Sequence, residues 1–287
     1  MIVMILTIIV TYNGEKYIED CLNSLLAQTR STDILIVDNA SSDNTCSIVQ
    51  NKYPTVKIIN IGYNSGFAHA NNVGIQYAID RGYKYVMLIN EDTISDNMLV
   101  ENLLKYADEQ TAVTPKIYMN GSQTKLWYAA GKIDFKTCEA VNCQKELADQ
   151  VAEVSFMTGC CMFLHTEILR KIGLFDENFF MYYEDTDLSL RMHENNIKMI
   201  FNPDAYLWHR LQGKTTKGYY VYYMERNKLF FLNKHKKLFD CNILKFILCS
   251  IQKIIIKPNI YMIAFNKYKI KGIIDFVRNK TGMMESR

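Results

Sequence analysis

The chain has 287 residues, of which 49% are hydrophobic and 22% are charged, so it can bury a core and a wholly disordered chain is excluded. Its net charge of +3 is too small for a protein that binds nucleic acid along its whole length. The charge is unevenly placed. Residues 226–287 carry 14 Lys and Arg against 3 Asp and Glu, a net +11, which leaves 19 against 27, or −8, for residues 1–225. This basic tail on an acidic body requires an explanation.

The first ninety residues alternate between β-branched apolar runs and segments with helical spacing of their apolar residues. The expected strands are residues 4–11, 33–37, 56–60 and 85–89. The expected helices are residues 17–28, 42–53 and 66–81. Strands that alternate with helices of this length form βαβ units, in which helices cover both faces of a parallel sheet. We therefore predict an α/β fold.

The pattern becomes less regular after residue 112. We expect loose structure over residues 113–154, including a polar, irregular insertion over 132–150 that covers a site. Regular structure should return over residues 154–164. Two further helices are expected over 166–172 and 185–195. From residue 219 the chain changes to aromatic, Lys-rich and Ile-rich segments, so we place a boundary after residue 217.

The basic tail combines its charge with apolar clusters. Its longest uncharged runs, residues 246–252 and 258–266, are far shorter than the roughly 20 residues that cross a bilayer. Apolar residues interleaved with Lys fit helices that lie on a membrane surface. Packing of these helices on the body, with the Lys side chains solvated, is the alternative, and dimerisation is another.

Nothing in the sequence indicates export. The apolar N-terminus lacks a basic region and a signal-peptidase site, and the eight cysteines contain no C-x-x-C pair. Reduced thiols in the cytoplasm are therefore expected.

Polar side chains follow each of the four expected strands. Because ligands bind beyond the carboxyl ends of the strands in an open α/β sheet, together they predict a site for a polar ligand. For any single loop, ordinary turn residues are an equally good explanation. Neither a Walker A motif nor a G-x-G-x-x-G after the first strand is present, which disfavours kinases, ATPases and Rossmann dehydrogenases. The polar residues are Thr11 and Asn13, then Asp38, then Asn64 and Gly66, and finally Asn90, Glu91 and Asp92.

Two acidic clusters stand out among the polar residues. Carboxylates in the Asn90-Glu91-Asp92 turn suit Mg²⁺ or Mn²⁺, which neutralises a diphosphate. Asp185 lies in the second cluster, Glu184-Asp185-Thr186-Asp187, at a predicted helix start. It is a candidate general base, although anions at a helix N-terminus are also explained by the helix dipole alone. His209 becomes a candidate ligand only because a metal site is already implied.

The motifs that contain these residues resemble glycosyltransferase family 2, and most closely its bacterial rhamnosyltransferase-like branch, which builds surface polysaccharides. The resemblance covers about residues 4–230 and implies a GT-A fold. It also implies inverting transfer of a sugar from a nucleotide-diphosphate sugar, dTDP-rhamnose or a UDP-sugar, to a lipid-linked glycan acceptor. The matching segments, in the family's order, are ILTIIVTYNGEKYIEDCLNSLLAQT, ILIVDNASSDNT, NIGYNSGFAHANNVGI, YVMLINEDT, MTGCCMFL, GLFDENFFMYYEDTDLSLR and WHR.

The resemblance also implies roles for individual residues. Asp185 would be the catalytic base, and Asp92 and His209 would bind Mg²⁺ or Mn²⁺. Residues 1–217 would form the catalytic domain, and residues 218–287 a basic, apolar helical region. The residues implied in nucleoside and donor binding are Thr11, Asn13, Asp38, Asn64, Gly66, Asn71, Asn90 and Gly159.

Two other functions compete with this interpretation. The first is a non-catalytic module that binds a sugar nucleotide or a glycan. The second is a nucleotidyltransferase, which residues 11–16 disfavour because they supply no Gly-rich, basic phosphate loop. The preferred hypothesis is a cytoplasmic enzyme held at the inner face of the cell membrane by its C-terminal region, without nucleic acid as a partner.

Overall fold

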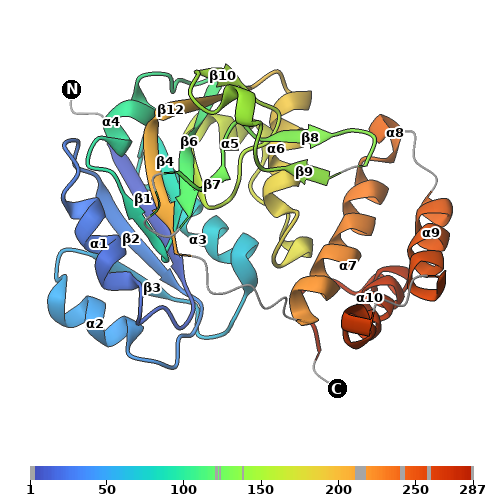
Figure 1. The fold of residues 1–287 in the computed structure, drawn as a ribbon. Helices are drawn as coiled ribbons and strands as arrows, with labels where there is room; N and C mark the ends of the chain where they lie inside the picture. Colours follow the sequence, from blue (N-terminus) through green and yellow to red (C-terminus); the bar gives the residue numbers. More distant parts are fainter. Residues whose placement is uncertain are drawn as a thin grey trace.

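The structure is a computed structural model that describes residues 4–119, 122, 124–137, 139–210, 218–239, 243–256 and 260–285. Its first half has the predicted βαβ arrangement (Figure 1). The four strands are parallel in the order β3-β2-β1-β4, which confirms the α/β prediction. The strands are β1 (Ile5–Thr11), β2 (Asp33–Asp38), β3 (Lys57–Asn60) and β4 (Tyr85–Asn90). The helices between them are α1 (Ile18–Leu26), α2 (Thr45–Lys52) and α3 (Gly66–Asp80).

The second half extends this sheet with strands of both directions. β11 (Cys161–His165) pairs antiparallel with β4, and β6 (Thr111–Met119) and β12 (Lys198–His209) follow it outward. Since β6 and β12 run parallel to each other and antiparallel to β11, their carboxyl ends lie at the same sheet edge as those of β1 to β4. The smaller elements are β5 (Thr93–Ser95), α4 (Leu99–Leu104), β7 (Leu126–Tyr128), β10 (Ala152–Glu153), α5 (Thr166–Ile172) and α6 (Glu184–Glu194).

Two sequence expectations are wrong in this half. Loose structure was expected from residue 113, yet β6 is a nine-residue strand that is buried over its first seven residues. β12, with twelve residues, was not anticipated at all. The expected insertion over 132–150 contains a small hairpin of β8 (Lys132–Asp134) and β9 (Glu139–Val141). β6 and β12 were not expected because they are defined by pairing with distant segments rather than by a local pattern.

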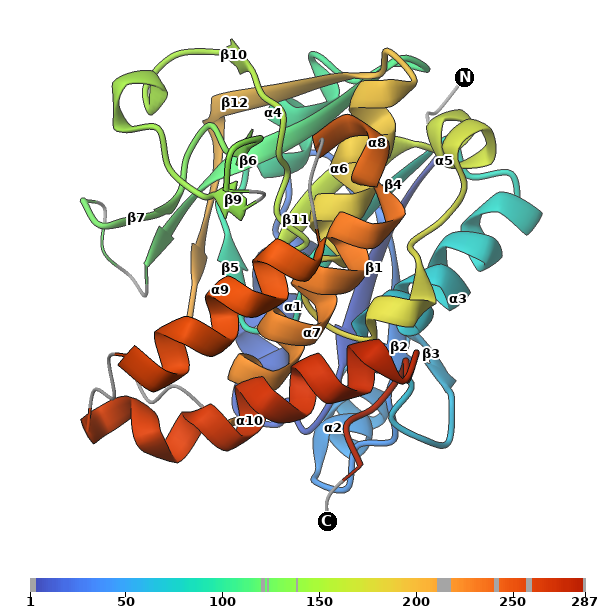
Figure 2. The same cartoon turned by 90° about the vertical axis from the view of Figure 1, so that its right-hand side faces the viewer.

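The C-terminal region is helical, as predicted. The chain forms α7 (Gly218–Lys234), α8 (Lys236–Phe239), α9 (Ile243–Ile256) and α10 (Ile260–Val277). Figures 1 and 2 show α7 lying between the body and the pair α9 and α10. Leu229, Phe231 and Leu232 of α7 are buried, so this helix packs on the body. Among the described helices, none combines the length and the apolar character that crossing a bilayer requires.

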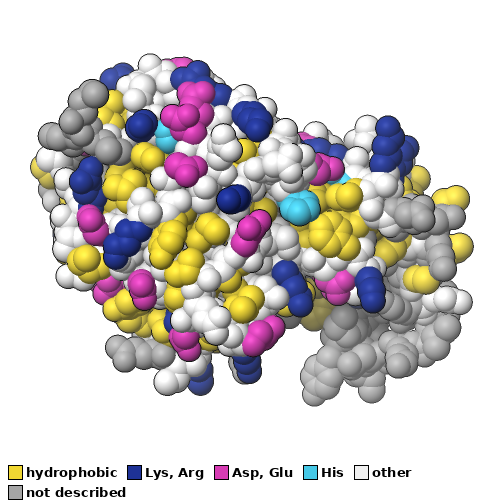
Figure 3. Space-filling view, turned by 90° about the horizontal axis from the view of Figure 1, so that it is seen from above, with side chains coloured by type: hydrophobic (Ala, Val, Ile, Leu, Met, Phe, Trp, Pro, Cys, Tyr) yellow, Lys and Arg dark blue, Asp and Glu magenta, His cyan; other side chains and the backbone are white. Residues whose placement is uncertain are grey.

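The surface of the body carries mixed charge. On the face that Figure 3 shows from above, acidic and basic side chains are interspersed among scattered hydrophobic ones. Residues 257–259, which include the start of one uncharged run of the tail, lie outside the described residues. Cys138 and Cys241 also lie outside them. The described free thiols are Cys21, Cys46, Cys143, Cys160, Cys161 and Cys249.

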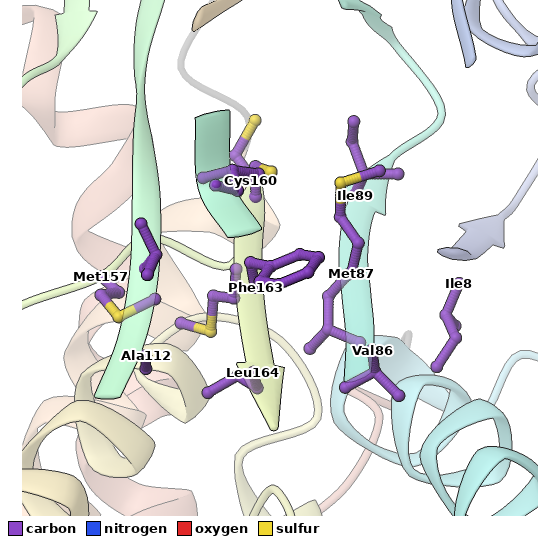
Figure 4. Close-up of a cluster of buried hydrophobic side chains, with 14 of the residues drawn as sticks. Ile8, Val86, Met87, Ile89, Ala112, Met157, Cys160, Phe163 and Leu164 are labelled. Carbon is purple, nitrogen blue, oxygen red and sulfur yellow. The ribbon is translucent and has the colours of Figure 1, made fainter. Parts of the chain in front are cut away.

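The core is continuous across the junction between the parallel strands and β11. Ile8, Met87 and Phe163 are fully buried, and Figure 4 shows the Phe163 ring of β11 pointing toward Met87 of β4. Burying such a side chain stabilises the fold by roughly 1.5–3 kcal/mol, so the pairing of β11 with β4 is firmly held. As a result, the start of β11 is fixed beside the carboxyl end of β4.

Candidate active site

The predicted nucleoside-binding residues lie where β1 and β2 end. Thr11 and Asp38 are register partners and fully buried, and the Thr11 hydroxyl donates to Asp38 Oδ1 at 3.0 Å. Asp38 Oδ2 accepts the Ser41 N–H at 3.0 Å, so this carboxylate also closes its own turn. Asn13 is exposed in the left-handed region, with φ of 57°, and its Oδ1 accepts the Ser42 N–H at 2.8 Å. These contacts tie the first two loops together.

The loop after β3 is built around Gly66. Asn64 Oδ1 accepts the Gly66 N–H at 3.1 Å, and Gly66 has a φ of +85°. A Cβ atom there would lie 2.5 Å from the Phe180 carbonyl oxygen, so only glycine fits. Asn71 is buried and donates to the Phe67 carbonyl of its own helix at 2.9 Å. The Asn71 amide therefore supports α3, and its role toward a donor remains a prediction.

Asp92 and His209 come together from distant parts of the chain. Pairing of β5 with β12 sets His209 opposite Thr93, and Asp92 Oδ1 lies 3.0 Å from His209 Nε2. One oxygen and one nitrogen at this separation fit two ligands of a divalent cation such as Mn²⁺. Within the described residues, no group of three or more His, Cys, Asp or Glu side chains could hold a metal. Phosphate oxygens and water would supply the remaining ligands.

Glu91, between Asn90 and Asp92, faces a different way. Its Oε2 accepts the Tyr12 N–H at 3.3 Å, and it fills the space where a side chain on Gly14 would lie. Burial, followed by repulsion from Asp92, raises the pKa of Glu91 to about 8. Glu91 is therefore largely protonated at neutral pH.

Asp185 lies in the first turn of α6, against the segment that leads into β11. Its Oδ2 accepts the Gly159 N–H at 3.0 Å, and its Oδ1 accepts the Thr186 N–H at 2.7 Å. Burial raises the pKa of Asp185, although these hydrogen bonds act in the opposite direction. Its neighbour Glu184 is buried, and burial and the charge of Asp185 raise the pKa of Glu184 well above its ordinary value.

The two acidic clusters lie at one sheet edge. The Cys160 carbonyl accepts the Asn90 N–H at 3.1 Å, which joins the start of β11 to the end of β4. Gly159, one residue earlier, contacts Asp185, and Asp92 lies two residues beyond Asn90. Asp92 and Asp185, which are far apart in the sequence, thus both lie beside the adjacent ends of β4 and β11.

Comparison with known proteins agrees with this geometry. The model of the family described as Glycosyl transferase family 2 matches residues 7–173. The chain belongs to glycosyl transferase family 2. It is 24% identical over 311 residues to the dTDP-rhamnosyl transferase RfbF of Shigella flexneri, covering 97% of each chain. It is 26% identical over 235 residues to an N-acetylglucosaminyl-diphospho-decaprenol L-rhamnosyltransferase of Mycobacterium tuberculosis, covering 72% of this chain and 76% of that one.

The fold is also similar to a solved glycosyltransferase. The mannosyltransferase PcManGT from Pyrobaculum calidifontis, in complex with GDP-Man and Mn²⁺, superposes with a TM-score of 0.61 and 15% identity, over 96% of this chain and 87% of that one. The expected GT-A fold and the resemblance to rhamnosyltransferases are therefore confirmed. This family 2 protein is a glycosyltransferase that uses a nucleotide sugar.

Sequence reasoning missed several residues around the site of this glycosyltransferase. The Trp127 ring packs edge-on against His209, with centroids 4.6 Å apart. Arg226 and Asn227 of α7 are fully buried and contact the loop before Asp185. An Arg-Asn pair inside the aromatic, apolar run VYYMERNKLFF was the available signal, because such residues are buried only where they have partners.

Asp187, the third carboxylate of the second acidic cluster, has a structural role. It is fully buried, and its Oδ1 lies 2.8 Å from both Lys234 Nζ and His235 Nε2, while Oδ2 accepts from Arg191 Nε at 2.9 Å. Burial alone would raise its pKa. The His235 hydrogen bond and the charges of Arg191 and Lys234 instead lower the pKa of Asp187 to about 2. This cluster joins α6 to the end of α7.

We predict that Asp187→Asn destabilises the protein by about 2 kcal/mol at pH 7, because it removes the fully buried carboxylate that pairs with Arg191 and Lys234. The folded-state pKa lies below the ordinary value of 3.8, so the stabilisation is complete above about pH 4 and is lost as the pH falls toward 2. Thermal unfolding of the two proteins should therefore differ most at pH 7, and the difference should shrink below pH 4. Asp204→Asn, at an exposed residue of β12, is the control. Melting curves of wild type and Asp187→Asn that coincide at pH 7 would contradict this role.

Proposed function

We propose that this glycosyltransferase is an inverting, metal-dependent enzyme that transfers a sugar, rhamnose from dTDP-rhamnose or a hexose from a UDP-sugar, to a hydroxyl of a lipid-linked glycan. The observation that carries the proposal is the placement of Asp185 at the same sheet edge as the Asp92–His209 pair. The names of the two rhamnosyltransferase relatives support the donor and the lipid-linked acceptor. The Mn²⁺ and GDP-Man in the solved relative support a metal-assisted reaction.

Asp185 would act as the general base. Its carboxylate, oriented by the Gly159 and Thr186 N–H groups, accepts the proton of the acceptor hydroxyl. The hydroxyl oxygen then attacks the anomeric carbon on the face opposite the departing nucleotide, which inverts the configuration there. The raised pKa of Asp185 strengthens its carboxylate as a base. One base suffices, so no covalent enzyme intermediate is needed.

Asp92 and His209 would hold the divalent cation at the end of the site opposite the base. When bound, the cation stabilises the negative charge that develops on the departing nucleoside diphosphate. Thr11, Asn13 and Asp38, at the ends of β1 and β2, would bind the nucleoside. The polar groups of the donor would thus extend along the sheet edge from β2 toward β4 and β11.

The C-terminal helices would bring the enzyme to the membrane surface. Leu244, Leu248 and Ile251 are 71%, 64% and 38% exposed, and their spacing places them on one face of α9. Ile270, Ile274 and Val277 form a similar stripe on α10 and are 44%, 42% and 69% exposed. Exposed apolar stripes in a region of strong positive charge fit an anionic membrane, where each basic residue adds about 1 kcal/mol. We also propose that residues 1–217 form the catalytic domain and that residues 218–287 form this membrane-contacting region.

Asp185→Asn should reduce transfer by at least about 100-fold, because general-base catalysis typically contributes 10²–10⁴-fold. Donor affinity, measured by calorimetry with Mn²⁺, should change little, because the amide keeps the shape of the side chain. Asp80→Asn, at the exposed end of α3, is the matched control. Transfer by Asp185→Asn at a rate close to wild type would refute the assignment. Donor binding without turnover by the wild-type protein would favour the non-catalytic module instead.

Removing divalent metal with EDTA should abolish transfer, and adding Mn²⁺ or Mg²⁺ should restore it. His209→Ala should raise the metal concentration needed for half-maximal activity by about tenfold or more, the usual range for a lost metal-site partner. His193→Ala, at the exposed end of α6, should leave it unchanged. Full activity in EDTA would show that the roles given to Asp92 and His209 are wrong.

The full chain should float with liposomes rich in anionic lipid and much less with neutral ones. Replacing Leu244, Leu248 and Ile251 with Gln should reduce flotation by at least about tenfold, because it removes the apolar stripe of α9. Replacing Leu26 and Val151, exposed apolar residues of the body, should not. Equal flotation of all three proteins would exclude this surface as the membrane contact. A shift from dimer to monomer in the α9 variant would instead assign it to dimerisation.

A further inference from the structure

The loop that leads into the catalytic helix has an unusual backbone. Phe180, Tyr182 and Tyr183 adopt positive φ values of 63°, 68° and 73°, although none is glycine. Such a conformation is strained for a residue with a side chain and persists only where its surroundings impose it. Tyr183 is the last residue before α6, and Asp185 lies two residues further along. The conformation of this loop therefore determines the position of Asp185, the proposed base.

Asn227 of α7 holds this loop directly. Its side-chain amide is fully buried, and Nδ2 lies 2.8 Å from the carbonyl oxygens of Phe179, Met181 and Tyr182. Two N–H groups are thus shared among three carbonyl groups of one short loop segment, which converge on the Asn227 amide. Carbonyl groups that converge in this way repel one another unless a donor lies between them, so the amide stabilises the strained backbone.

Arg226 supports the same loop. Its guanidinium group is fully buried, and Nη2 donates to the Phe179 carbonyl at 3.1 Å, while Nη1 donates to the Gly282 carbonyl at 2.7 Å. Its Nε donates to Asn227 Oδ1 at 2.9 Å, which orients the amide of Asn227 toward the loop. The faces of Tyr222 and Tyr223 lie about 5 Å from its cationic carbon. Burying a charge is costly unless it is fully bonded, and here every arm of the fork has a partner.

The other side of Asp185 is fixed by the same helix. Lys234 and His235, at the end of α7, bind Asp187 in the first turn of α6. In addition, the Phe180 carbonyl accepts the Phe67 N–H at 2.7 Å, so the loop also contacts the start of α3 beside Gly66. The loop is thus held from several sides, and a shift of its Tyr182–Tyr183 end would move the base.

We infer that Asn227 and Arg226 are positioning residues for the transfer reaction: they hold the Phe179–Tyr183 loop in its strained conformation and thereby place Asp185 for proton abstraction. The inference rests on the proposed role of Asp185. By this inference α7 contributes to catalysis, although α7 lies beyond residues 7–173, the segment that the family model matches.

The test is the Asn227→Asp variant in the full chain. Aspartate has the same shape but turns a carboxylate oxygen, not an N–H donor, toward the three carbonyls. We expect kcat to fall by about 100-fold, as for a displacement of about 1 Å at a reacting group. The dissociation constant of the donor with Mn²⁺ should stay within about twofold, with one donor bound per chain. If the substitution only reduced the fraction of folded protein, the number of donor molecules bound per chain would fall below one. The apparent kcat would then fall by the same factor as donor binding.

Two further variants keep the experiment decisive. Asn202→Asp makes the same change at a fully buried amide that supports β12 and α4, so it should lower stability without lowering kcat. If Asn227→Asp does not fold, Asn227→Ser removes the donor amide without adding charge and is measured in the same way. A folded Asn227 variant with kcat within about threefold of wild type would overturn the inference. Asp185→Asn is assayed in parallel. If Asp185→Asn is inactive while the Asn227 variants are active, only the positioning inference fails. If Asp185→Asn is active, the proposed base is wrong.

Discussion

The hydrogen bond from the Gly159 N–H to Asp185 Oδ2 is the contact on which the arrangement of the site depends. It ties the first turn of α6 to the segment that enters β11, and β11 in turn is paired in register with β4. A Cβ atom on Gly159 would lie 3.0 Å from the Phe67 ring, so the absence of a side chain lets these elements meet. Because β11 is fixed against β4, Asp185 and the Asp92–His209 pair share one sheet edge.

How much of this could be predicted depends on how local each feature is. The strands and helices up to β4 follow from periodicity, and the residues at the strand ends follow from the parallel sheet. β12 was missed because its register shifts between Asn202 and Tyr206, where the sequence NPDA resembles a turn. The meeting of Asp92 with His209 requires the pairing of β5 with β12. The family resemblance implied that Asp92 and His209 bind the same metal, but residue spacing alone could not predict that they meet.

The C-terminal helices would have two roles. On the inner side, α7 places Arg226 and Asn227 against the loop before the base and Lys234 and His235 against Asp187. The sequence could indicate that Arg226 and Asn227 are buried, but not that their partner is a loop with positive φ angles, because no sequence pattern specifies that loop. On the outer side, α9 and α10 present apolar stripes. The tail would thus link the membrane, where a lipid-linked acceptor resides, to the helix that orients the base.

We propose that this sheet edge binds an activated sugar between the cation ligands, Asp92 and His209, and the base, Asp185. The most direct measurement is a crystal structure of the enzyme with Mn²⁺ and an unreactive nucleotide-sugar analogue. The account predicts Mn²⁺ bound by Asp92, His209 and the diphosphate, with the anomeric carbon facing Asp185 across a space that fits one acceptor hydroxyl. A nucleotide bound away from the ends of β1, β2 and β4, or an anomeric carbon turned away from Asp185, would contradict it.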